Sequence, residues 1–203
     1  MSRTADPSRK PALLAEVLEY LLDKPLASLT FRSLADGLDV STYTLVYHFG
    51  SRAQLINEIV SAITERQDVV VREITAEQGD IPAHLANLRH SWQLSLAPRA
   101  QQLQRLEFEA ALLEMREPGT QQASLAMFHR WHRVGVDALV AMGLDPDDAE
   151  IEARTITDTI YGLHYDLIVS RDVARVSAAF ERAILAYEDR LVALLGDKDR
   201  LTA

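Results

Sequence analysis

The sequence predicts an all-α protein of about nine helices, and two observations support this fold class. Apolar residues recur at spacings of three and four along most of the 203 residues, which is the pattern of amphipathic helices. Glycine and proline are sparse, with 8 and 7 residues, and many of them lie between these periodic segments. No stretch shows the sustained period-two alternation of a half-buried strand.

Four helices are predicted in the N-terminal part of the chain, and each has a hydroxyl residue at its start that can cap its first turn. The helices span about 8–23, 31–38, 42–48 and 52–76, and the capping residues are Ser8, Thr30, Ser41 and Ser51. Pro11 suits the first turn of the first helix. Asp39 lies where the chain must turn between the second and third helices.

Five further helices are predicted after residue 79, separated by glycine and proline breaks. The clearest break is 143–148, where a glycine is followed by a capping Asp145, by Pro146 at the first helical position and by two acids near the positive helix end. The last two helices, after residues 146 and 172, have the longest apolar stripes.

Composition excludes several classes of protein. The chain has no cysteine, which excludes disulfides and thiolate chemistry and suits a reducing cytoplasm. No apolar run approaches the ~18–20 residues that cross a bilayer, and the N-terminal ten residues lack the apolar core of a secretory signal. No phosphate-binding glycine loop, metalloprotease motif or nucleophile elbow is present, so we expect no enzyme and no cofactor.

Charge is unevenly distributed along the chain. Residues 1–52 contain six basic and six acidic residues and are neutral, so the whole net charge of −9 falls on residues 53–203. Only the N-terminal end could therefore bind a polyanion, and the remainder would repel one.

The segment STYTLVYHFGSR, residues 41–52, combines polar and aromatic side chains in an unusual way for a helix. Two short helices joined by about four residues and braced by a preceding helix form a helix-turn-helix, although an ordinary helical corner has the same outline. Helical spacing turns Leu45 and Phe49 toward the core, with Val46 at its border. The hydroxyl, phenol and imidazole groups that remain suit contacts with phosphates and base edges.

Residues 29–60 resemble the DNA-binding domain of the TetR family of bacterial transcriptional regulators. The family pattern T-x-x-x-I-A-x-x-x-G-V-S, followed by Y-x-H-F-x-S-K, is matched by Thr30, Leu34, Ala35, Val40, Ser41, His48, Phe49, Ser51 and Arg52. Asp39 replaces the glycine of the turn, and Val46 replaces a tyrosine that contacts phosphate, with Tyr47 next to it. Asp tolerates the left-handed conformation that such a turn needs.

The resemblance implies a DNA-binding domain at 1–52 and an effector-binding and dimerisation domain at 53–203. Thr42 and Tyr43 would contact base edges, and Arg32 a base or a phosphate. The DNA backbone would be held by Thr44, Tyr47, His48 and Arg52, with Ser41 at the helix N-terminus that phosphates favour. Arg9 and Lys10 either add phosphate contacts or belong to a solvated arm.

The resemblance also implies a homodimer through the last two helices, so that two recognition helices contact a palindromic operator of double-stranded DNA. Helices four to seven would bind a small-molecule effector, which releases a repressor from its operator through helix four. The candidate pocket residues are His90, Trp92, Phe108, Met115, Phe128, Trp131, His132 and His164, although aromatic residues at helical spacing are more often core. His129 and His132 have helical spacing but no third ligand, so we expect no metal.

A second function remains open on the sequence alone. The neutral charge of residues 1–52 also fits a helical small-molecule-binding or adaptor protein that does not bind DNA, because a strong DNA-binding domain usually has an excess of basic residues.

Overall fold

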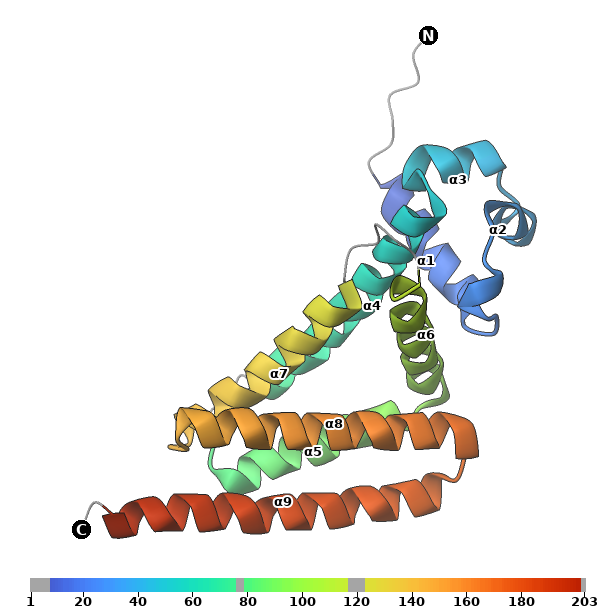
Figure 1. Ribbon diagram of the computed structural model, residues 1–203. Helices are drawn as coiled ribbons and strands as arrows, with labels where there is room; N and C mark the ends of the chain where they lie inside the picture. The colour runs from blue at the N-terminus through green and yellow to red at the C-terminus, as the bar shows by residue number, and fades with distance from the viewer. Residues whose placement is uncertain (1–7, 76–78, 117–122, 202–203) are drawn as a thin grey trace. The chain divides into compact units, whose positions relative to one another are not determined.

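The computed structural model describes residues 8–75, 79–116 and 123–201, and these residues form α-helices with no strand, which confirms the all-α prediction (Figure 1). The helices are α1 (Arg9–Leu21), α2 (Phe31–Leu38), α3 (Thr42–Phe49), α4 (Arg52–Thr75), α5 (Ile81–Ser95), α6 (Pro98–Glu114), α7 (Ala123–Ala141), α8 (Pro146–Ser170) and α9 (Val173–Leu201). A short 3-10 helix, η1 (Leu26–Ser28), lies in the connector between α1 and α2. No helix of the described residues is long and apolar enough to cross a membrane.

Three of the four predicted hydroxyl caps are formed. Thr30 and Ser33 cap α2 reciprocally. The Ser41 hydroxyl accepts a hydrogen bond from the Thr44 amide, and the Ser51 hydroxyl accepts one from the Gln54 amide. Ser8 makes no capping hydrogen bond with its side chain, which corrects that prediction. The reason is its backbone, which is already helical at φ −80° and ψ −16°, whereas a capping residue is normally extended.

The chain divides into two compact units, residues 1–66 with 102–125 and residues 67–101 with 126–203. The boundary at residue 66 lies inside α4, so the packing units differ in extent from the functional domains predicted at 1–52 and 53–203, which stay predictions. The first unit buries apolar residues of α1, α2, α3 and the first half of α4 around Leu106 and Ala110 of α6. The second unit has its own core, formed mainly by α5, α8 and α9.

The turn between α2 and α3 has the geometry that the sequence predicts. Asp39 adopts the left-handed conformation at φ 52°, and the Val40 amide donates to the Ala35 carbonyl. The Tyr20 hydroxyl donates to the Ser33 carbonyl at 3.1 Å and fastens α1 to α2. A side chain at Gly37 would place its Cβ 2.1 Å from the Tyr20 ring, so this close approach requires glycine.

Candidate nucleic-acid interface

Helix α3 is attached to the first unit by one face and exposed on the other. Leu45 and Phe49 are buried, as the sequence predicts. Tyr43 and Tyr47 are 78% and 62% exposed, and their rings stack with centroids 6.4 Å apart. Two stacked phenols on an exposed helix offer ring surface and hydroxyl groups to a ligand.

Val46 lies on the same exposed face, which differs from its predicted place at the border of the core. Its side chain is 46% exposed, and it stands three residues after Tyr43 and one before Tyr47. Helical spacing alone could have placed it there, because positions three apart share a face. The exposed face thus has an apolar side chain beside the two stacked phenols, and apolar groups can contact the methyl group of thymine.

Of the hydroxyl residues predicted to contact DNA, Ser41 and Thr44 bond to each other at the start of α3, and Thr42 is exposed. The Ser41 hydroxyl accepts the Thr44 amide at 3.0 Å and lies 2.8 Å from the Thr44 hydroxyl. These two groups therefore hold the start of α3, while the neighbouring Thr42 is exposed. His48 is half-buried and meets the Tyr47 ring edge-on at 5.1 Å, so it supports that ring.

The cations around this face differ in their surroundings. Arg32 on α2 is exposed. Arg52 is half-buried, and its Nε donates to the Leu29 carbonyl at 3.0 Å, so it also connects the start of α4 to the segment before α2. Arg9 and Lys10 form ion pairs with Glu16 and Glu58 at 3.1 and 2.5 Å. Such exposed pairs are weak and can exchange their carboxylate for a phosphate.

Among the predicted pocket residues, the structure brings Trp92 and His164 together. In the second unit, the Trp92 ring lies between His164 at 5.3 Å and Phe180 at 4.6 Å, nearly parallel to both. Its Nε1 donates to the Ser177 hydroxyl at 3.1 Å. Trp92 is therefore a packed core residue with its polar group satisfied.

Burial lowers the pKa of His164 to about 4, because its charged form would lose solvation. In the unfolded chain His164 binds a proton at about pH 6.5, whereas in the folded chain it binds one only at about pH 4. Protonation therefore favours the unfolded state, and the free energy of unfolding falls as the pH drops from about 6.5 to about 4. His164→Phe keeps a ring against Trp92 but cannot bind a proton. We expect this variant to retain up to about 3 kcal/mol of unfolding free energy that wild type loses over this pH range. Urea unfolding at fixed protein concentration between pH 4 and 8 measures it. An unchanged pH profile in the variant would contradict the assignment.

The other pocket candidates have separate surroundings. In the second unit, Phe128 packs edge-on against Tyr161 at 5.7 Å, and His132 is buried with its Nε2 2.6 Å from Glu150. His90 is exposed and Trp131 is half-buried. In the first unit, Phe108 is half-buried and Met115 exposed. Within the described ranges, no three potential metal ligands cluster around His129 and His132 or elsewhere.

Exposed apolar and small residues lie along one face of α8 and along one face of α9, and we call them together the outer stripe. It consists of Ile151, Thr155, Gly162, Tyr165 and Val169 on α8 and Ala178, Leu185, Val192 and Gly196 on α9. One exposed acid lies on each of these faces, Asp158 on α8 and Asp189 on α9. The members on α8 recur every three, four or seven residues, so they share one face of that helix. Nothing lies within 4 Å of a side chain placed at Gly162 or Gly196.

Comparisons with known proteins bear on the fold. No protein-family model matches the sequence, and no curated protein matches it either. Among solved structures, a TetR transcriptional regulator from Legionella pneumophila has a TM-score of 0.70 and 16% identity, over 94% of this chain and 98% of that one. A protein from Saccharomonospora viridis in complex with choline gives 0.71 and 14%, over 93% and 97%. The ketosteroid transcriptional regulator KstR2 of Mycobacterium tuberculosis gives 0.61 and 18%, over 92% and 97%.

These matches cover nearly all of both chains at low identity. The chain therefore has the fold of TetR-family transcriptional regulators, from the helix-turn-helix at α2 and α3 to the paired helices α8 and α9. The fold predicted by the resemblance is confirmed.

Proposed function

We propose that this protein is a TetR-family transcriptional regulator that binds a palindromic operator as a homodimer and represses transcription in the cytoplasm until a small molecule releases it. The observation that supports this best is the exposed face of α3, where Tyr43, Val46 and Tyr47 stand together on a helix-turn-helix. A helix in this arrangement fits the major groove, and its exposed side chains then meet base edges.

The outer stripe supports the dimer. A palindromic operator needs two recognition helices about 34–36 Å apart, which one chain with one helix-turn-helix cannot supply. Exposed apolar groups along paired helices favour association, and glycines allow two helices to approach closely. The twofold symmetric contact of α8 and α9 with a second copy would bury these groups.

A small-molecule effector is supported by the neighbours in fold. The Saccharomonospora viridis protein is in complex with choline, so a protein of this fold binds a small molecule, and KstR2 is described as a ketosteroid transcriptional regulator. The second unit of this chain offers aromatic and histidine side chains on α5, α7 and α8. The neighbours described as transcriptional regulators also favour regulation over an enzymatic function.

The test is selection of double-stranded DNA by the full-length protein from a randomised library, followed by a salt titration on the selected sequence. If Arg32 and Arg52 supply the ionic contacts of each half-site, four phosphates are neutralised and log Kobs falls against log salt with a slope of about −4. Enrichment of a palindrome with a slope near this value supports the proposal. Recovery of no DNA would favour the adaptor protein, and a slope steeper than about −7 would mean that Arg9 and Lys10 also bind phosphates.

A further inference from the structure

Helix α1 ends without a left-handed capping residue. Its last turn has no basic residue, and its C-cap, Leu22, is helical where many helices place a left-handed glycine. The final carbonyl groups of a helix have no partner within the helix and carry partial negative charge. Two of these carbonyls accept local backbone amides, that of Glu19 from Leu22 and that of Leu21 from Lys24. A carbonyl oxygen has two lone pairs, so this end of α1 can still accept a donor from elsewhere in the chain.

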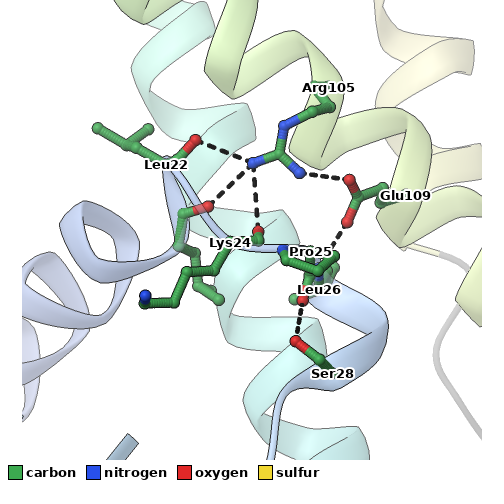
Figure 2. Close-up of polar contacts among 8 residues, drawn as sticks. Leu22, Lys24, Pro25, Leu26, Ser28, Arg105 and Glu109 are labelled. Atoms are coloured by element: carbon green, nitrogen blue, oxygen red, sulfur yellow. Dashed lines mark hydrogen bonds and ion pairs between the residues drawn. The ribbon is translucent and has the colours of Figure 1, made fainter. Parts of the chain in front are cut away.

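Arg105 of α6 is that donor (Figure 2). Its Nη2 donates to the carbonyl oxygens of Leu21 and Leu22 at 3.0 Å each and to that of Lys24 at 3.2 Å. The two hydrogens of Nη2 are shared among these three carbonyls, and the guanidinium places a positive charge at the negative end of α1.

Glu109, one turn further along α6, completes the arrangement. One carboxylate oxygen pairs with Arg105, and the other accepts the Leu26 amide at 2.5 Å, at the start of η1. The residue before Leu26 is Pro25, whose side chain makes no capping hydrogen bond. The ion pair is about one quarter exposed, at 26% and 28%, so water screens it less than an open surface pair. Residues 105 and 109 are called the α6 clamp below.

The clamp holds the connector, residues 22–30, at one end while Arg52 holds it at the other. The Leu29 carbonyl accepts from Arg52, and the next residue, Thr30, caps α2. Gln102 adds a hydrogen bond from α6 to Asp23 at 2.8 Å. The connector that places α2 is therefore fixed by polar groups of both α6 and α4.

The clamp is separable from the attachment of α6 itself. Leu106 and Ala110 on the same helix are fully buried in the core of the first unit, so apolar packing keeps α6 in place. Leu26 and Leu29 of the connector are buried in the same core. Loss of the clamp should consequently loosen the polar side of the connector without detaching α6 or unfolding the unit.

We propose that Arg105 and Glu109 are positioning residues for operator binding. They act through the connector: by fixing residues 22–26 they set the placement of α2, and with it the exposed face of α3. The effect on operator affinity rests on the proposed function, whereas the hydrogen bonds of the clamp do not.

The experiment compares wild type, Arg105→Gln, Glu109→Gln and the double variant by amide hydrogen exchange and by operator affinity. We expect faster exchange of the Leu26 amide and the end of α1, and operator affinity reduced by about 3- to 30-fold with unchanged sequence preference. The double variant should lose less than the product of the two single losses, since the residues act together. Arg89→Gln is the control, because it removes an ion pair with Glu181 at 3.0 Å in the second unit.

Circular dichroism at the assay temperature establishes that each variant remains folded, so that a loss of affinity reflects placement of α2. If folded Arg105→Gln and Glu109→Gln bind the operator as tightly as wild type, or if connector exchange is unchanged, the proposal is wrong. If wild type binds no DNA, the proposed function fails, while exchange of the Leu26 amide still decides whether α6 holds the connector.

Discussion

Gly162→Leu is expected to convert the proposed dimer into monomers and to weaken operator binding by about 10²- to 10⁴-fold. Gly162 is exposed on α8, and nothing in its own chain lies within 4 Å of an added Cβ. The protomer has room for a Cβ at this exposed position, and leucine should favour the helix by about 1 kcal/mol relative to glycine. Only a second copy packed on the outer stripe would be obstructed.

The size of the effect follows from the two half-sites. When two modules are joined, the second binds at a high effective concentration, which adds about 10²–10⁴ in apparent affinity without any new contact. A monomer loses this gain although its own helix-turn-helix is intact. Sedimentation velocity gives the mass, and a mobility shift with the palindromic operator gives the affinity.

Two further variants make the result decisive. Ala86→Leu adds the same side chain at an exposed position of α5, outside the outer stripe, and should leave mass and affinity unchanged. Tyr165→Arg places a charge at a stripe residue that is 62% exposed, and should also give monomers. Dimers of normal operator affinity in both Gly162→Leu and Tyr165→Arg would exclude the outer stripe as the interface.

Local chemistry explains why the helices could be predicted from the sequence. Thr30 and Ser41 each come directly before a segment with helical apolar spacing, which is the position of an N-cap residue. Asp39 lies in the turn, and aspartate is one of the few residue types that adopt the left-handed conformation readily. Ser8 shows the limit of this reasoning. A capping residue type caps only if its backbone is extended, and the backbone conformation at Ser8 is helical.

The α6 clamp could not be predicted, because its partners are distant in sequence and chemically unspecific. Arg105 contacts three backbone carbonyls more than 80 residues away, and a carbonyl leaves no trace in the side-chain pattern. Arg105 and Glu109 in isolation resemble an ordinary surface pair of an exposed helix. The same applies to Arg52, which a motif suggests as a phosphate contact but which also bonds to the Leu29 carbonyl.

Packing also decides which aromatic residues are available to a ligand. Tyr43 and Trp92 both lie on amphipathic helices, yet Tyr43 is exposed and Trp92 lies between two rings with its Nε1 bonded. Helical spacing separates the two faces of a short helix such as α3. It does not separate core from pocket on α5, since both face inward.

Tyr43→Ala is expected to lower affinity for the selected operator by about 1–3 kcal/mol per half-site while leaving non-specific DNA binding almost unchanged. Tyr43 is the most exposed aromatic residue of α3 and lies in its first turn, the part of a recognition helix that meets base edges. Loss of a base contact removes discrimination between sequences, whereas ionic attraction to the DNA backbone persists.

Tyr43→Phe separates the ring from its hydroxyl, since phenylalanine keeps the stack on Tyr47. If the ring contacts a thymine methyl, Tyr43→Phe binds as wild type; if the hydroxyl contacts a base edge, it resembles Tyr43→Ala. Arg52→Ala is the comparison for backbone contacts and should weaken binding to all DNA alike, because it removes a cation and loosens the connector at Leu29. Affinities for the operator, for single-base variants of it and for unrelated DNA distinguish these cases. Equal loss on every DNA in Tyr43→Ala would move Tyr43 from the bases to the phosphates, and sequence recognition would then depend on Thr42, Val46 and Arg32.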